Sequence, residues 1–240
     1  MAGKFLRGAF VEFTETFPIP IPNIIIFQFN PETMTHTWAP AHAGGGGGGA
    51  PAAGKAPANP LAVTGAPGES FSFSLAMDAG DMIADGGVGG ALAEVSGVYT
   101  RLAALEMLLF PTAPPGGGLI GSVTAALGIG GSAGSDPTRS VPASQLPTVL
   151  FIWGPGRILP VRVTSLAITE KLYDSVLLNP THADAQVGLT VLTPEELAFV
   201  DGPLGSLAKT AYDFSHGLRE ALAIANLANS VESVIGMLPL

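Results

Sequence analysis

Alternation of polar and apolar residues is the pattern that most restricts the fold of this chain. In residues 68–78, GESFSFSLAMD, every second residue is large and apolar, from Phe71 and Phe73 onward, and serines occupy most of the positions between them. A period of two places successive side chains on opposite faces of a strand. Such clean alternation is typical of antiparallel sheets with one face packed and the other in water or against another subunit.

A second strand is expected over residues 24–38, in the run NIIIFQFNPETMTHTW. Thr35 and Thr37 point one way there, while His36 and Trp38 point the other. Because Pro31 cannot donate to a ladder, we expect this strand to bend or to lie at a sheet edge at that point. A shorter strand is predicted over residues 9–14, and the alternating prolines of FPIPIP predict a stiff, extended connection between the two.

Three more strands are expected between residues 149 and 192. Trp153-Gly154-Pro155-Gly156 is typical of a hairpin turn, with glycine supplying positive φ values. In the strand that follows, the apolar positions change face near Ser165, which indicates a bulge. Residues 183–192 alternate again.

Helices are expected in two places. Apolar residues recur at helical spacing over residues 90–111 and predict one helix that covers the sheet. Thr193 and Glu196 have the spacing of a capping box, and the tail from Pro203 predicts an amphipathic helix interrupted at Gly217. We therefore expect a tube-like β domain over 1–195 and a helical extension over 196–240. Flexible Gly/Pro-rich insertions are expected at 39–68 and 111–147.

Composition excludes one class of partner and several kinds of site. The net charge of −9 argues against nucleic acid, because affinity for phosphates comes from Lys and Arg. The absence of Cys rules out disulfides and thiolate metal ligands. The apolar segment 119–129 falls below the roughly 20 residues that span a bilayer, and no secretory signal pattern is present. A protein assembled in the cytoplasm, with no membrane insertion, is therefore expected.

No constellation of catalytic, cofactor-binding or metal-binding residues emerges from the sequence. His36, His42, His182 and His216 lack the spacing of metal ligands. Asp78, Asp81 and Asp85 do not match a calcium loop and are interpreted as turn and cap residues. Residues 44–49 are all glycine but are not followed by the Lys-Ser/Thr of a phosphate-binding loop. We expect a protein that is not an enzyme.

Three segments in order resemble a known family. FQFNPETMTHTW, GESFSFSLAMDAGD and PTVLFIWGPGRILPVRVTSLAITEKLYDSVLLNPTHADAQVGLTVL together are similar to the N-terminal domain of contractile injection system tube proteins. The resemblance covers roughly residues 5 to 195 without the two insertions. It implies a mainly β fold with α elements, namely an antiparallel tube-like barrel or sandwich with one packing helix.

The resemblance also implies a function. It points to a baseplate component of a phage-tail-like particle, of the tube-initiator or hub-adaptor type, that forms a six-fold ring between the inner tube and the spike. The implied partners are copies of itself, the inner tube protein, the spike or hub protein, and other baseplate or sheath subunits. The particle would then be either released from the cell or anchored to a membrane. Longer members of this family carry a LysM module where the helical tail of this chain begins.

Residues at the expected subunit interfaces follow from these strands and from the tail. They are Phe29, Asn30, Pro31, Glu32, Phe71, Phe73, Asp78, Trp153, Gly154, Arg157, Phe214, Leu218 and Leu222. Two alternatives stay open: a subunit of the tube body, and a soluble binding module with a β-barrel pocket.

Overall fold

Seven strands form one antiparallel sheet in the order β2-β1-β5-β6-β7-β4-β3. The computed structural model describes residues 6–14, 21–41, 65–111, 146–200 and 202–237. Its strands are β1 (Ala9–Thr14), β2 (Ile21–Ile26), β3 (Met34–Ala39), β4 (Gly68–Asp78), β5 (Val149–Ile152), β6 (Ile158–Tyr173) and β7 (Pro180–Val191). The predicted insertions fall mainly on residues 42–64 and 112–145, outside the described ranges.

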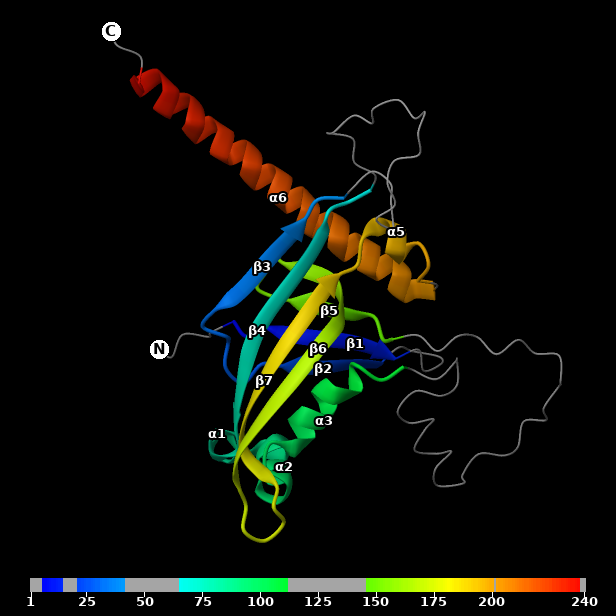
Figure 1. Ribbon diagram of the computed structural model, residues 1–240, viewed down its shortest axis with the longest axis vertical. Helices are drawn as coiled ribbons and strands as arrows, with labels where there is room; N and C mark the ends of the chain where they lie inside the picture. The colour runs from blue at the N-terminus through cyan, green and yellow to red at the C-terminus, as the bar shows by residue number, and fades with distance from the viewer. Residues whose placement is uncertain (1–5, 15–20, 42–64, 112–145, 201, 238–240) are drawn as a thin grey trace, which may run out of the picture.

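The sheet is open, because β2 and β3 lie at its two edges and do not pair with each other. The prediction of a barrel or sandwich is therefore wrong, although the antiparallel pairing is confirmed. Together with its helices, the chain has a mixed α/β fold (Figure 1).

The strand predicted over residues 24–38 is two strands. After Ile26 the chain leaves one edge of the sheet, crosses it, and starts β3 at the other edge with Met34. The backbone N–H of Phe27 donates to the carbonyl of Gly8 at 2.9 Å. The Asn30 side chain accepts from the N–H of Gly8 and donates to the carbonyl of Leu6. The Gln28 side chain donates to the carbonyl of Asp78 on β4 and accepts from its N–H. Residues 27–33 thus form a crossing segment that is bonded to the chain just before β1 and to the end of β4 rather than to a sheet ladder.

The alternation in β4 is confirmed. Its apolar residues Phe71, Phe73, Leu75 and Met77 are buried, while the serines between them lie on the more exposed face. Five phenylalanines from β1, β4, β5 and the crossing segment meet there, with neighbouring ring centroids mostly 5.0 to 6.4 Å apart. They are Phe10, Phe27, Phe71, Phe73 and Phe151. This aromatic cluster forms the centre of the core.

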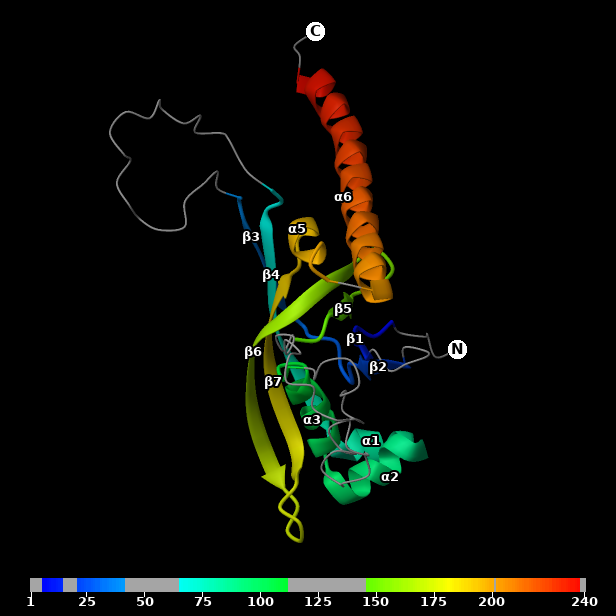
Figure 2. The same ribbon diagram turned by 90° about the vertical axis from the view of Figure 1, so that its right-hand side faces the viewer.

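The hairpin and the bulge predicted in the second half are both present. The N–H of Trp153 donates to the carbonyl of Arg157 at 2.8 Å, and Gly154 has a φ of 73°. The register of β6 against β7 shifts between Val163 and Ser165. Beyond the bulge, β6 and β7 continue as a long hairpin that reaches past the neighbouring helices (Figure 2).

Two helices, α2 (Gly87–Ser96) and α3 (Tyr99–Met107), replace the single helix predicted over residues 90–111, and a third, α1 (Ala79–Asp85), precedes them. The break between α2 and α3 lies at Gly97, which has a φ of 59° and lies against the backbone carbonyl of Pro180. The N–H of Val98 donates to that carbonyl at 2.9 Å. Leu102 and Leu105 of α3 are buried in the same core as the phenylalanines.

The C-terminal part contains α5 (Pro194–Leu197) and α6 (Gly202–Met237). The capping box is confirmed, since Thr193 and Glu196 exchange both bonds between side chain and backbone. The predicted interruption at Gly217 is wrong: α6 runs on for 36 residues, about 54 Å at 1.5 Å per residue. Its first half lies along the sheet, and its second half extends away from it (Figures 1 and 2).

Candidate functional site

A buried carboxylate attaches α6 to the sheet. Glu69 on β4 is only 3 % exposed, and both of its oxygens accept hydrogen bonds from the guanidinium of Arg219 on α6. The Nε2 atom of His36 on β3 lies 2.8 Å from Glu69 Oε1. Because a buried charge is costly unless it is paired, these contacts fix the three elements relative to one another.

Aromatic rings complete the surroundings of this ion pair. The guanidinium of Arg219 lies over the ring of Trp38, 4.9 Å from its centroid, and the His36 ring stacks on Phe71 at 4.3 Å. One turn earlier on α6, the buried Ser215 hydroxyl donates to the carbonyl of Ile158 and accepts from its N–H. Burial raises the pKa of the nearby Tyr212 phenol, and the Glu69 carboxylate raises it further. The first half of α6 is therefore fixed to both β6 and the β3 edge.

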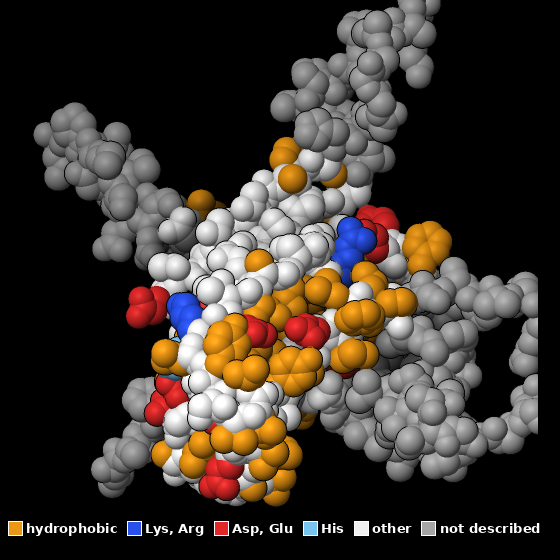
Figure 3. Space-filling model, turned by 60° about the horizontal axis from the view of Figure 1, so that its bottom comes forward, with side chains coloured by type: hydrophobic (Ala, Val, Ile, Leu, Met, Phe, Trp, Pro, Cys, Tyr) orange, Lys and Arg blue, Asp and Glu red, His pale blue; other side chains and the backbone are white. Residues whose placement is uncertain are grey.

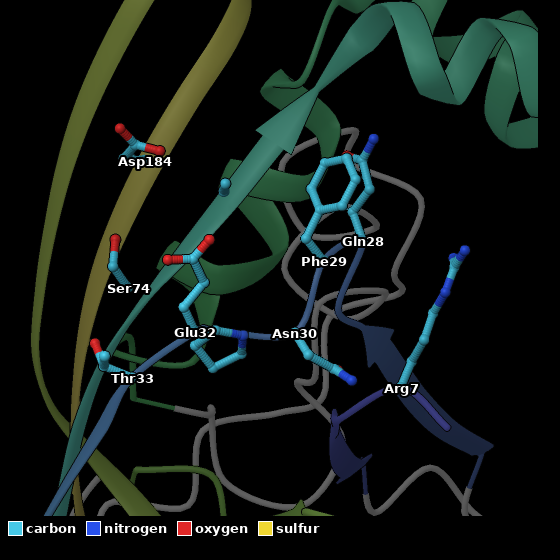
Figure 4. A pocket seen from close by; sticks show the side chains of 10 residues that line it. Arg7, Gln28, Phe29, Asn30, Glu32, Thr33, Ser74 and Asp184 are labelled. Carbon is cyan, nitrogen blue, oxygen red and sulfur yellow. The ribbon is translucent and has the colours of Figure 1, made fainter. Parts of the chain in front are cut away.

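A pocket of about 810 Å³ lies beside the crossing segment. Phe29, Asn30, Pro31 and Glu32, all predicted interface residues, line it together. Figure 4 shows Ser74 and Asp184 on one side of the pocket and Arg7 on the other. Asp184 pairs with Lys171 and Asn30 bonds to the backbone of Leu6 and Gly8, so two of its polar side chains are already engaged.

Other predicted interface residues have roles inside the subunit, in the core or at a helix cap. Phe71 and Phe73 are each 2 % exposed and belong to the core rather than to the surface. Asp78 is the N-cap of α1, as the cap interpretation predicted, and its Oδ2 atom lies 2.9 Å from Nδ1 of His182.

The residues of the β5–β6 turn hold that hairpin against the core. Trp153 is half-buried and packs on Phe27 and Phe151. The Arg157 guanidinium lies 5.8 Å from the centroid of the Phe71 ring. Gly154 supplies the positive φ of the turn.

The predicted residues of the tail do not share one environment. Leu218 is half-buried and packs so close to Gly156 that a Cβ there would lie 2.8 Å from its Cδ2 atom. Phe214 and Leu222 are 51 % and 61 % exposed. Of the three predicted tail residues, only Phe214 and Leu222 therefore lie at the surface.

Sequence analysis missed an apolar surface at the end of the molecule opposite to the C-terminus. It consists of the β6–β7 hairpin tip and the outer side of α2 and the start of α3, and we call it the apolar end (Figure 3). Its exposed residues are Val88, Leu92, Val95, Tyr99, Leu172, Tyr173, Val176, Leu177 and Leu178.

Hydrogen bonds hold the apolar end in shape. Asp174 Oδ2 accepts from the N–H groups of Val176 and Leu177, and Asn179 donates to the carbonyl of Val95 on α2. The signal in the sequence was the run Val-Leu-Leu inside a turn, where polar residues are usual.

Within the described ranges, no three residues among His, Asp and Glu gather as a metal ion would require. His42 lies outside those ranges. Nor does any described helix combine the length and the apolar character needed to cross a membrane. No protein-family model matches the chain, and a search of curated proteins gives no match.

Proposed function

We propose that this chain is a structural subunit of a contractile, phage-tail-like injection particle, where it forms a ring at the baseplate between the inner tube and the spike. Support comes from the ordered segments that resemble tube proteins and from an antiparallel sheet built by those same segments. Each copy would contact its two neighbours in the ring, the tube protein and the spike or hub protein.

The observation that carries this proposal is the pair of sheet edges. Among the described residues, β2 has only β1 as a partner and β3 has only β4. Unpaired edges invite pairing with another chain unless they are protected. Ile24 and Ile26 on β2 are 54 % and 51 % exposed, and β3 carries no Lys or Pro.

Edge pairing between copies would produce a ring. The β2 edge of one copy and the β3 edge of the next are different surfaces, so their contact is heterologous. A heterologous contact closes into a ring when the rotation per copy divides the circle, and this is the arrangement that we propose.

The apolar end supports contacts above or below such a ring. It exposes large apolar side chains from the β6–β7 hairpin tip, α2 and the start of α3, with acidic side chains among them (Figure 3). Extended apolar surfaces of this kind mark sites of interaction in soluble chains. This surface is suited to a permanent contact with the tube or the spike.

Native mass spectrometry of the purified chain, combined with copy-number measurement in sheath-containing particles, tests the proposal. We expect a closed ring of about six copies in solution and the same number per particle, beside abundant tube and sheath proteins. A chain that stays monomeric at all concentrations and is absent from such particles would contradict it.

The pocket at the crossing segment favours one alternative. Its volume of about 810 Å³ is within the range of small-molecule sites, so a soluble binding module is the second candidate. That protein would be a stable monomer with saturable binding of a ligand. The other alternative, a subunit of the tube body, predicts a copy number equal to that of the tube protein.

A further inference from the structure

The apolar stripe of α6 changes sides halfway along the helix. In the first half, the row that faces the sheet is apolar or hydrogen-bonded to it and consists of Ala208, Ala211, Ser215 and Leu218. The opposite row is polar and exposed, and consists of Lys209, Asp213, His216 and Glu220.

After Leu222, which is apolar but 61 % exposed, the two rows exchange their character. At spacings of three and four, the sheet-facing row continues in the sequence as Leu222, Asn226, Asn229 and Ser233. The opposite row continues as Ile224, Leu227, Val231 and Val234. Ile224 and Leu227 are 69 % and 62 % exposed. Ile224 and Leu227 are therefore exposed apolar residues on the side of α6 that faces away from its own sheet.

We call the row of Ile224, Leu227, Val231 and Val234 the outer row. Its spacing is the one with which two helices pack against each other in a coiled coil. Residues 224, 227, 231 and 234 follow the three-four-three pattern of a and d positions, with which one helix packs its side chains between those of another. A stripe that only had to meet its own sheet would stay on the row of Ala211 and Ser215.

We propose that the second halves of α6 from neighbouring copies of this chain pack together in parallel along this outer row. Residues 221–240 contain a single charged residue, Glu232, so a charged partner would find almost nothing to complement. A second copy supplies an uncharged stripe of the same length and spacing. The parallel arrangement rests on the proposed ring, because copies related by rotation point their helices in the same direction when these run along the ring axis. This inference goes beyond the ring contacts, since it involves neither sheet edge.

Single cysteines provide the first test, because the chain contains none of its own. Each residue from 221 to 227 is replaced in turn by Cys in the full chain, and the disulfide-linked dimer is measured after mild oxidation. In a parallel pair, identical a and d positions approach each other, so crosslinking should peak at 224 and 227. A flat profile, or a maximum at 222 and 225, would overturn the proposal.

A charge pair provides the second test. The variant Ile224→Asp/Leu227→Asp should weaken self-association in sedimentation velocity by at least tenfold, because it places like charges in the contact. The matched control is Ala221→Asp/Ala225→Asp, two exposed positions away from the outer row, and it should associate like the wild type. Circular dichroism of both variants checks that α6 stays helical.

The outcomes separate this proposal from the proposed function. Self-association of Ile224→Asp/Leu227→Asp that is as strong as that of the wild type would overturn the helix packing and leave the ring intact. Crosslinking at 224 and 227 in a chain that is absent from contractile particles would support the helix packing and contradict the baseplate function. Co-sedimentation with phosphatidylcholine vesicles that depends on Ile224 and Leu227, without a crosslinking maximum, would overturn the helix packing in favour of a membrane partner.

Discussion

Arg219 of α6 binds both carboxylate oxygens of Glu69 on β4, which joins two residues 150 positions apart in the sequence. Glu69 is almost fully buried, and its remaining partner is His36 on the edge strand β3. The position of the helix on the sheet therefore depends on a charge that water cannot reach.

Arg219→Ala should lower the free energy of unfolding by about 3 kcal/mol, because it leaves a buried carboxylate without its main partner. Urea unfolding followed by circular dichroism measures this loss. Glu220→Ala is the control, since the neighbouring pair of Glu220 with His216 is exposed and worth less than about 1 kcal/mol. Equal stabilities of the two variants would contradict the role of Glu69.

Gly97→Ala should destabilise the protein by about 2 kcal/mol or more, because a Cβ there would lie 2.2 Å from the carbonyl oxygen of Pro180 in addition to the strain of a positive φ. Gly87→Ala separates the two effects. Gly87 also has a positive φ, of 71°, but no atom lies within 4 Å of its added Cβ. The midpoint of thermal unfolding should fall clearly further for Gly97→Ala than for Gly87→Ala.

Gly188→Ala should destabilise the long β6–β7 hairpin, since the added Cβ would lie 2.3 Å from the hydroxyl of Ser165 at the bulge. Removal of that hydroxyl by Ser165→Ala should recover part of the loss. A double-mutant cycle in urea measures this coupling, which we expect at about 1 kcal/mol. Additive effects of the two substitutions would show that the bulge relaxes without this contact.

Phe214→Asp and Leu218→Asp should behave differently, although both lie in the tail. Phe214 is half exposed, so its replacement should change stability by no more than about 0.5 kcal/mol. Leu218 packs on Gly156, and an unpaired carboxylate there should cost about 2 kcal/mol. Thermal unfolding of the two variants compares them directly, and similar midpoints would contradict this packing of α6.

Ile24→Lys/Ile26→Lys should prevent ring formation while leaving the subunit folded. Charged side chains on an edge strand are a common protection against pairing with other chains, and both isoleucines are more than half exposed. Native mass spectrometry should show the loss of the closed ring. Phe199→Lys, at an even more exposed apolar residue away from the edge, should still form rings.

Patterns that depend on neighbours in the sequence were readable without the structure. The alternation of β4, the turn after Trp153, the bulge near Ser165 and the capping box of Thr193 all follow from local backbone and side-chain preferences. Each of them is confirmed because no distant contact opposes the local preference.

Features that depend on distant contacts were not readable. The chain after Ile26 looks like a continuing strand, yet Phe27 joins an aromatic cluster whose other members come from three other strands. The helix break at Gly97 depends on the carbonyl of Pro180, more than eighty residues away. The apolar end was missed because Leu92 and Val95 match the pattern of a buried helix face, yet both are at least half exposed in the structure.

Because α6 is attached to the sheet only in its first half, a small tilt at the attachment moves the far end of the helix by a larger distance. Ser215 and Arg219 hold it to β6 and β4, and the 18 residues from 220 to 237 extend beyond that attachment for about 27 Å. A tilt of about 10° at Arg219 would therefore displace the far end of the helix by about 5 Å. A neighbour that pairs with β3 would act on the strand carrying His36 and Trp38, and a small shift of that edge would be magnified at the tip of α6.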